Sequence, residues 1–421
     1  MKAEIISVGT ELLLGSTVNT DAADVAVLLS EYGINVYWQT VVGDNPGRVA
    51  EAVRRARERA DLIITTGGLG PTCDDLTKSA LAEGFGMELK LDRGEEEWLR
   101  GLWEKRGYRE FTPNNLQQVY LPEGSTPLRN DWGTAPGCTF TADGVLVIML
   151  PGPPGECRPM LQYRVRPILA ALSDSVIASH NIHFFGIGES EMEYRLRDYM
   201  NELTNPTLAP YAKQGECLVR VTASAPTAEK AEEMMAPVVE RVRGMFGELA
   251  YGMDCANLAE YTTRLMIERG VTVAAAESCT GGEFTKAITD IPGASAVLLG
   301  GMVVYTNEAK HKLLGVSEEL LREKGAVSYE VAVELARRAR ETLGSDLGIG
   351  ITGLAGPDGD GVHEVGTVFI SLADGENVWV REKHINARSR AQVRLYACQN
   401  AFDMIRRRLD GYSVEEIRVD P

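Results

Sequence analysis

The feature that most limits the possible folds of this chain is a regular alternation of apolar runs with helical patterns. In residues 1–168, continuous apolar runs such as 61–68 are typical of buried strands, and amphipathic runs such as 46–60 and 75–86 are typical of helices. Strands that alternate with helices predict a parallel sheet covered by crossover helices. Ligand sites of such sheets lie at the carboxyl ends of the strands, and these ends are rich in glycine here.

The same pattern divides the 421 residues into segments. Residues 169–254 contain two strand-like and two helical runs, which predict a small α+β domain. The alternation resumes in residues 255–410, where the run 365–385 predicts a hairpin before a final helix. Residues 411–421 are polar and predict a loose tail. We therefore expect an α/β protein of three domains.

The charge of the chain narrows the classes of function. Against 60 Asp and Glu residues there are 43 Lys and Arg, a formal net charge of −17, which disfavours binding of nucleic acid over a broad surface. No apolar stretch reaches the roughly 18–20 residues of a membrane span. The N-terminus, MKAEIISVG, lacks the pattern of a signal peptide. We expect a cytoplasmic protein with small-molecule ligands and without nucleic-acid or membrane partners.

A Gly-rich turn with two aspartates is the first candidate site. The strand that ends in Gly67 and Gly68 runs directly into LGPTCDDLT and a helix. In such a turn the backbone N–H groups and the helix N-terminus bind an anion. Asp74 and Asp75 would repel a bare phosphate, so the turn predicts a divalent cation, Mg²⁺ or similar, held by these two carboxylates. The alternative is that Asp75 only caps the helix beginning at Leu76.

Further acidic residues follow other strands of this segment. Glu11 lies in GTELLLG after the first strand, and Asp44 lies in VVGDN after the second. The turns NDWGTAPG and LPGPPGE, the latter ending at Glu156, are of the Gly/Pro kind that lines pockets. Acidic side chains beside Gly-rich backbone at strand ends predict a metal-assisted site for a phosphorylated ligand.

Four of these motifs, GTELLLG, TGGLGPTCDDLT, GTAPG and LPGPPGE, resemble the CinA (competence/damage-inducible protein A) family in order and spacing. Their domain also resembles the molybdopterin-binding domain of molybdenum cofactor biosynthesis, which implies a three-layer fold around a parallel sheet. The resemblance implies hydrolysis of ADP-ribose with a divalent metal, with Asp75 as the working aspartate and Asp44 as a second acidic residue. The matching motif positions imply substrate contacts from Glu11, Gly67, Gly68, Thr72 and Glu156.

The run VTVAAAESCTGGEFTKAI is the sharpest motif of the C-terminal segment. An apolar strand leads into Ser278, and Gly281 and Gly282 then open a helix. A serine on such a turn is exposed to substrate, and backbone N–H groups around the glycines can hold an oxyanion. The alternative is that Ser278 and Thr280 only cap the helix.

A serine nucleophile needs a base, and the histidines of this segment lie on a helix and in a loop. Lys310 follows Tyr305 by five residues across a strand-to-helix turn, so both can face one pocket. A lysine acts as a base where burial lowers its pKa, and Tyr305 can relay the proton or orient the serine. Thr352 and Gly353 end another strand at the same edge of the sheet. The alternative for Lys310 is a solvated helix lysine.

This segment resembles the nicotinamide-nucleotide amidase domain of the same family through ESCTGG, PGAS, GGMVVYTNEAKHKLLGV, GAVS and ITGLAGP. The resemblance implies hydrolysis of nicotinamide mononucleotide to nicotinic acid mononucleotide and ammonia, without a cofactor. In the mechanism that the resemblance implies, Ser278 attacks the amide carbon, and Lys310 with Tyr305 transfers the protons. The other implied site residues are Gly281, Gly282, Thr352, Gly353 and Arg390, the last holding the substrate phosphate.

Two details qualify this resemblance. Cys279 beside the serine is a rival nucleophile, which we expect to be buried instead. The loop DGVHEVGTV is shorter than is usual in the family and lacks its Lys-Pro pair.

The middle segment resembles the KH-like domain that joins the two enzymes in this family. A KH domain clamps nucleic acid through a GxxG loop, whereas the nearest loop here, FGIGE at 185–189, lacks that spacing. We interpret the segment as a spacer or a dimer element, and we expect a homodimer.

Three functional hypotheses follow. The first is a two-site enzyme of pyridine-nucleotide salvage, because ADP-ribose and nicotinamide mononucleotide are both products of NAD breakdown. The second is that the N-terminal domain binds a nucleotide or molybdopterin-like ligand without turnover. The third, a regulator of competence or DNA damage responses, has no support from individual residues.

Overall fold

The computed structural model describes residues 1–72, 74–107, 111–172, 175–375, 377–386 and 389–414, and the backbone of 418–419. By its contacts the chain divides into two compact units, Met1–Ser179 with Ala223–Met234 and His180–Thr222 with Met235–Pro421. The predicted mixed α/β class is confirmed. The middle segment contributes residues to both units.

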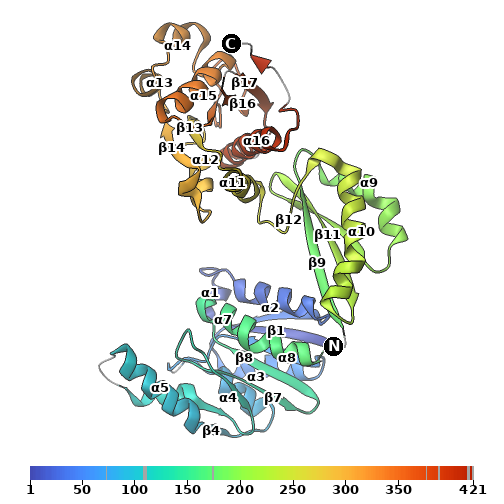
Figure 1. The fold of residues 1–421 in the computed structure, drawn as a ribbon. Helices are drawn as coiled ribbons and strands as arrows, with labels where there is room; N and C mark the ends of the chain where they lie inside the picture. Colours follow the sequence, from blue (N-terminus) through green and yellow to red (C-terminus); the bar gives the residue numbers. More distant parts are fainter. Residues whose placement is uncertain are drawn as a thin grey trace. The chain divides into compact units, whose positions relative to one another are not determined.

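A six-stranded sheet with helices on both faces forms the first unit (Figure 1). The strands lie in the spatial order β2 (Asn35–Val42), β1 (Lys2–Val8), β3 (Leu62–Thr66), β8 (Val145–Leu150), β7 (Gly137–Ala142) and β6 (Thr126–Leu128). The first four are parallel, as predicted. The last two are antiparallel and escape prediction, because they are short and carry no continuous apolar run.

Alternation along β1 shows how the layers form. Ile6 and Val8 pack against α3 (Pro46–Arg57) and α4 (Thr77–Gly84). Ala3 and Ile5 point the other way, toward the helices α2 (Thr20–Glu31), α7 (Pro154–Met160) and α8 (Arg166–Leu172), the last two joined by a π-helical turn at Leu161–Val165. The three-layer arrangement expected for this domain is therefore present.

Between α4 and β6 the chain adds a small substructure to this unit. It contains a two-stranded antiparallel sheet and two helices: β4 (Leu89–Leu91), α5 (Arg93–Arg106), α6 (Pro113–Leu116) and β5 (Tyr120–Pro122). A single helical turn, α1 (Thr10–Leu13), follows β1.

The middle segment supplies a four-stranded sheet and two helices. The strand order is β10 (Thr207–Lys213), β11 (Glu216–Ala225), β9 (Val176–Phe184) and β12 (Ala250–Met253), with α9 (Glu189–Glu202) and α10 (Ala228–Phe246). These are the strands and helices that the sequence pattern predicts, with β10 and the short β12 in addition.

The C-terminal part of the second unit has a second six-stranded sheet. Its order is β14 (Leu298–Val303), β13 (Val273–Glu277), β15 (Leu347–Gly353), β16 (Thr367–Asp374), β17 (Asn377–His384) and β18 (Arg418–Val419). The first three are parallel, and β16 with β17 forms the predicted hairpin. One face is covered by α11 (Leu258–Arg269), α12 (Glu283–Thr289) and α16 (Arg390–Asp410), the other by α13 (Asn307–Leu314), α14 (Glu318–Lys324) and α15 (Tyr329–Leu343).

Part of the polar segment 411–421 lies against this domain, which differs from the loose tail that its composition predicts. Val414 is buried in the core, and β18 pairs with β17. Of the rest, residues 415–417, 420 and 421 lie outside the described residues.

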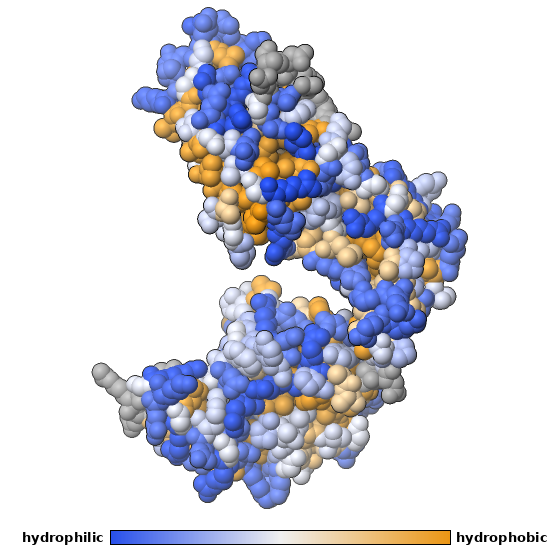
Figure 2. All heavy atoms as spheres, in the orientation of Figure 1, coloured by the Kyte–Doolittle hydropathy of each residue, from blue (hydrophilic) through white to orange (hydrophobic). Residues whose placement is uncertain are grey.

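The described helices include none that combines the length and the apolar character needed to cross a membrane. Figure 2 shows hydrophilic residues over much of the face it presents, with a band of hydrophobic residues on the C-terminal part of the second unit. The exposed apolar residues of the described chain include Leu299 and Val303 of the edge strand β14.

Candidate active sites

Three neighbouring parallel strands bring the C-terminal candidate residues together. Ser278 directly follows β13, which pairs on one side with β14 and on the other with β15. Lys310 lies in α13 after β14, while Thr352 and Gly353 end β15. Because the carboxyl ends of parallel strands meet at one edge of a sheet, residues distant in sequence converge there.

Ser278 and Lys310 form the direct contact that the sequence predicts. Nζ of Lys310 lies 3.1 Å from Oγ of Ser278 and donates to the carbonyl oxygens of Val304 at 2.9 Å and Tyr305 at 3.3 Å. Lys310 is 1% exposed and Ser278 8%. Burial lowers the pKa of Lys310 from its ordinary 10.5 to about 8, because the ammonium loses its hydration. Lys310 is therefore not a solvated helix lysine.

The helix after the serine is capped by Glu277 and not by Ser278 or Thr280. The Glu277 carboxylate accepts from the N–H groups of Gly282 (2.9 Å), Phe284 (3.1 Å) and Thr285 (2.9 Å), and from the Thr285 hydroxyl (2.9 Å). The N-cap residue itself is Gly282, without a side-chain cap. The alternative that Ser278 serves only as a cap is wrong, and its hydroxyl is left facing Lys310.

Glu277→Gln is expected to lower the free energy of unfolding by about 2 kcal/mol, because a buried charged acceptor at a helix N-terminus is replaced by a neutral amide that also brings two donors. Chemical denaturation followed by circular dichroism measures this loss. Glu308→Gln, in the first turn of α13 and exposed, is the matched control and should change stability by less than about 0.5 kcal/mol. Equal stability of the two variants would contradict the capping role.

The backbone donors of the serine turn differ from those expected. The Gly281 N–H donates to Ser278 O and the Gly282 N–H to Glu277, so neither is available to an oxyanion. Both glycines have positive φ, 60° and 94°, which explains why glycine is needed there. Among the described residues, no oxygen accepts from the N–H of Cys279 or Thr280. These two groups are the better candidates to hold an oxyanion.

Arg394, which the sequence analysis did not identify, stabilises the turn after Ser278 by hydrogen bonds to its backbone. Its guanidinium donates to the Thr280 carbonyl at 3.1 and 2.6 Å and pairs with Glu283 at 3.3 Å. Its spacing could have identified it, because Arg394 lies one helical turn after Arg390 on the same face of α16. The capping role of Glu277 could also have been predicted, because a carboxylate placed shortly before a Gly-rich turn can reach the N-terminus of the helix that follows.

Tyr305 and Arg390 meet at the exposed side of the site. The Tyr305 hydroxyl accepts from Arg390 at 2.8 Å, and Arg390 also donates to the Gly356 carbonyl. Tyr305 is 57% exposed, and only its backbone carbonyl contacts Lys310. This arrangement favours a binding role for the hydroxyl over proton relay to the serine.

Thr352 and Gly353 lie at the end of β15, next to the site, and stabilise the backbone there. The Thr352 hydroxyl donates to the Ala326 carbonyl at 2.7 Å and is buried. A Cβ at Gly353 would lie 2.7 Å from the Thr367 carbonyl oxygen, so a larger residue would displace the hairpin. Thr352 therefore anchors the end of β15 through a hydrogen bond, and Gly353 allows close packing against the hairpin. Neither residue has a hydrogen bond to Ser278 in the described structure.

Cys279 is buried packing, as expected. It is 5% exposed within the core, and burial raises the pKa of its thiol to about 12. A thiol with such a pKa carries almost no thiolate at neutral pH. Ser278 is the better nucleophile of the two.

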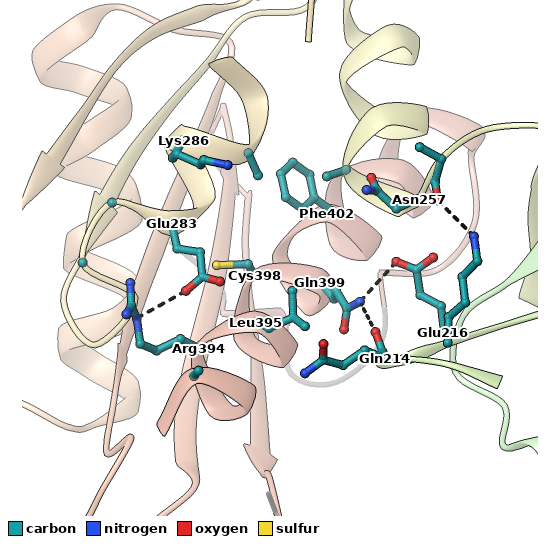
Figure 3. A pocket seen from close by; sticks show the side chains of 17 residues that line it. Gln214, Glu216, Asn257, Glu283, Lys286, Arg394, Leu395, Cys398, Gln399 and Phe402 are labelled. Carbon is teal, nitrogen blue, oxygen red and sulfur yellow. Dashed lines mark hydrogen bonds and ion pairs between the residues drawn. The ribbon is translucent and has the colours of Figure 1, made fainter. Parts of the chain in front are cut away.

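A cavity near the serine turn lies behind it and is not lined by Ser278. It has a volume of about 770 Å³ and is lined by 17 residues, among them Gly281, Gly282 and Arg394. Figure 3 shows Arg394 paired with Glu283 on one side, and Gln399 reaching Glu216 and the Gln214 carbonyl on the other. The contact between Ser278 and Lys310, and not this cavity, therefore marks the candidate site.

In the first unit a cavity of about 570 Å³ lies at the carboxyl ends of β1, β2, β3 and β8. All the N-terminal candidates line it: Glu11, Asp44, Gly67, Gly68, Thr72, Asp74, Asp75 and Glu156. Five of these are acidic, and no Lys or Arg is among the described residues of the lining. In the part of the chain that the structure describes, no three side chains of His, Cys, Asp or Glu come together as around a protein-caged metal.

Hydrogen bonds orient the carboxylates of this acidic cavity. Oδ2 of Asp75 accepts from the Thr72 N–H at 2.8 Å and the Thr72 hydroxyl at 2.6 Å. Asp44 accepts from the Thr10 N–H at 2.9 Å, and Glu156 accepts from Asn130 at 2.6 Å. The helix α4 begins at Thr77 without a side-chain cap, so the alternative that Asp75 merely caps it is wrong.

Gly67 and Gly68 let the loop approach its neighbours closely. Both have positive φ, and a Cβ would lie 2.2 Å from the Val8 carbonyl oxygen at Gly67 and 2.2 Å from the Thr77 hydroxyl at Gly68. The glycines are therefore required by the path of the backbone at the cavity floor.

Comparison with known proteins matches three consecutive parts of the chain. Family models described as a probable molybdopterin binding domain, a damage-inducible protein CinA KH domain and a CinA C-terminal domain match residues 4–171, 179–252 and 255–409. A CinA-like protein of Desulfovibrio desulfuricans is 47% identical over 99% of this chain and 98% of its own length. A CinA-like protein of Dictyoglomus turgidum is 42% identical over 97% and 99%.

Solved structures resemble parts of the chain. The protein CinA with unknown function from Thermoplasma acidophilum is 38% identical, with a TM-score of 0.37, and covers 40% of this chain and 97% of its own. A competence/damage inducible protein from Agrobacterium tumefaciens is 35% identical, with a TM-score of 0.35, over 37% and 96%.

Proposed function

The chain belongs to the CinA family, and from this premise we propose that it is a two-site hydrolase of pyridine-nucleotide breakdown products. The C-terminal site deamidates nicotinamide mononucleotide, and the N-terminal site hydrolyses ADP-ribose with a divalent metal. The observation that carries the proposal is the buried contact of 3.1 Å between Lys310 Nζ and Ser278 Oγ. A serine hydroxyl beside a buried amine is a nucleophile next to a group that can act as its base.

Neutral Lys310 is the base of the amidase. A neutral amine has two N–H donors and one lone pair. The carbonyls of Val304 and Tyr305 accept the two donors, so the lone pair faces the Ser278 hydroxyl. Lys310 takes the serine proton as Oγ bonds to the amide carbon of the substrate, and the carbonyl oxygen becomes an oxyanion.

Backbone groups of the turn after Ser278 stabilise the charge that forms in the reaction. The N–H groups of Cys279 and Thr280 hold the oxyanion, and Arg394 keeps the Thr280 carbonyl turned away from it. The lysine returns its proton to the leaving nitrogen, ammonia departs, and water then cleaves the acyl-serine with Lys310 as base again. Arg390, beside Tyr305, binds the substrate phosphate.

The titration of Lys310 sets the expected pH dependence. Because only the neutral amine accepts a proton, kcat/KM should rise about tenfold per pH unit below pH 8 and level off above it. A pH profile of ammonia release measures this. Lys310→Arg, which stays protonated, should be inactive throughout. Lys312→Arg, two residues away and exposed, is the matched control and should keep the wild-type profile. A profile that is flat from pH 6 to pH 9 would refute the lysine base.

The acidic cavity fits a divalent cation better than a bare diphosphate. Five carboxylates without a basic side chain in the described lining would repel the ligand, whereas Mg²⁺ binds through one or two carboxylates together with waters and phosphate oxygens. Asp74 and Asp75 would hold it, and Thr72 orients Asp75 for this role. When bound, such a metal neutralises the diphosphate charge. Asp44, held by Thr10, orients the attacking water.

A second candidate for the N-terminal domain is binding without turnover. The match of residues 4–171 to a family model described as a probable molybdopterin binding domain favours it. Incubation of the protein with ADP-ribose, once with Mg²⁺ and once with a chelator, separates the two candidates. AMP and ribose 5-phosphate form with Mg²⁺ only if the site is catalytic. Ammonia release from nicotinamide mononucleotide without added metal tests the C-terminal site in the same preparation.

A further inference from the structure

The cavity of about 770 Å³ behind the serine turn, called here the rear cavity, takes no part in the proposed amidase reaction. It lies within the second unit, and its walls come from the middle segment and from the C-terminal part. The turn between β10 and β11 supplies Gln214 and Glu216 on one side, and α12 and α16 supply the other side (Figure 3). Its volume is within the range of small-molecule sites.

The floor of the rear cavity is apolar. Leu395, Cys398 and Phe402 of α16 lie between its two sides (Figure 3), and Ala259 and Ala287 add further apolar surface. The thiol of Cys398 stays protonated, because burial raises its pKa. Such a floor accommodates the ring or another apolar part of a ligand.

Both sides of the rear cavity carry positive side chains with unused hydrogen-bond donors. Arg394 donates through Nε and Nη2 to the Thr280 carbonyl, and its Nη1 has no acceptor among the described residues. On the other side, the only described acceptor of Lys213 Nζ is the Ala256 carbonyl at 3.3 Å. Lys286 adds a third positive charge on the side of Arg394 (Figure 3).

The two carboxylates of the described lining already have partners. Glu216 accepts from the Tyr251 hydroxyl at 2.5 Å, the Gln399 amide at 3.1 Å and a backbone N–H, and Glu283 pairs with Arg394 at 3.3 Å. The described lining thus holds three cationic and two anionic side chains, in a chain whose net charge is −17. The unused donors and the balance of charge both favour an anionic ligand.

We propose that the rear cavity binds a small organic anion with an acidic group at each end of a ring-bearing body, and that this ligand regulates the amidase. One acidic group binds Nη1 of Arg394, the other binds Lys213, and the body lies on the apolar floor. The inference rests on the proposed amidase. Its product, nicotinic acid mononucleotide, has a carboxylate on the ring and a phosphate on the ribose, whereas the substrate has a neutral carboxamide. The cavity therefore favours product over substrate.

Arg394 connects the rear cavity to the serine turn. Its guanidinium holds the Thr280 carbonyl, and a Cβ at Gly281 would lie 3.8 Å from its Nη2. An acidic group on Nη1 competes for the guanidinium and weakens its hold on Thr280. Because the Thr280 N–H is a proposed oxyanion donor, a ligand in the rear cavity should lower kcat while the serine site stays open to substrate.

Filling the rear cavity tests the proposal. Gln214 is exposed and its side chain has no hydrogen bond in the described structure, so Gln214→Trp adds bulk to the lining without disturbing the fold, and Gln214→Ala is its control. Calorimetry counts the molecules of nicotinic acid mononucleotide bound per chain, and we expect Gln214→Trp to bind one fewer than wild type. Lys213→Gln should weaken that binding about tenfold. Lys324→Gln, which changes an exposed lysine outside the described lining, should not.

Ammonia release in the presence of added nicotinic acid mononucleotide gives a second readout. In wild type the added product should lower kcat for nicotinamide mononucleotide. In Gln214→Trp it should raise only KM, through competition at the serine site, and the rate without added product should equal that of wild type.

The outcomes separate the rear cavity from the proposed reaction. If Gln214→Trp binds one molecule fewer than wild type, the binding site stands even when nicotinamide mononucleotide is not deamidated. If ammonia is released, but wild type and Gln214→Trp bind the same number of molecules and are inhibited alike, the amidase stands and the rear site is refuted. Loss of one bound molecule without any change in inhibition would keep the site and refute its regulatory role. Failure of the wild type to bind the product refutes both.

Discussion

Ser278→Ala is expected to reduce ammonia release from nicotinamide mononucleotide by roughly a thousandfold or more, because it removes the atom that forms the acyl bond. The substitution deletes one oxygen whose only hydrogen-bond partner among the described residues is Lys310 Nζ, so the fold should survive. Ammonia release is followed over time with purified wild-type and variant protein, without added metal.

Cys279→Ala is the matched control for this prediction. The thiol is buried and its pKa is raised to about 12, so its removal should leave the amidase rate within a few-fold of wild type. An unchanged circular dichroism spectrum and melting temperature of Ser278→Ala would show that the variant is folded. An active Ser278→Ala with an inactive Cys279→Ala would assign the chemistry to the thiol and overturn the serine mechanism.

Asp75→Asn should lower metal-dependent hydrolysis of ADP-ribose by roughly 10²- to 10³-fold, because it removes a negative charge that the cation and the reaction need. Asparagine tests the role of the charge more specifically than alanine. Its side-chain oxygen can still accept from the Thr72 N–H and hydroxyl, which keeps the loop in place. Formation of AMP is measured across a range of Mg²⁺ concentrations.

The amidase of the same variant serves as its control. Asp75→Asn should release ammonia at the wild-type rate, just as Ser278→Ala should still hydrolyse ADP-ribose, because each residue serves one site only. An Asp75→Asn protein that hydrolyses ADP-ribose normally would favour the alternative in which the N-terminal domain only binds its ligand.

Much of the C-terminal site could be predicted because it depends on topology. Parallel strands place the residues that follow them at one edge of the sheet, so Ser278 after β13 and Lys310 after β14 had to lie near each other. The same argument predicts the acidic cavity, where Glu11, Asp44 and Asp75 follow three adjacent strands. In both cases the apolar periodicity of the strands was sufficient.

Hydrogen-bond partners could not be predicted in the same way. The pattern suggests Ser278 or Thr280 as the helix cap, but the Glu277 side chain reaches the N–H groups of the first turn and takes that role. It also suggests that Tyr305 assists the serine, whereas the Tyr305 hydroxyl meets Arg390. Each choice depends on the direction of a side chain, which periodicity does not encode.

The sequence by itself determined the alternation of strands and helices and therefore which residues reach the sheet edges, because these follow from local apolar patterns. Only the tertiary structure decided which of those residues touch. Ser278 and Lys310 are 32 residues apart, and Arg394 and Thr280 are 114 apart. The burial that shifts the Lys310 pKa comes from elements that meet only when the chain is packed. Local pattern cannot specify such contacts, because hydrogen bonding and desolvation depend on every element that surrounds a group.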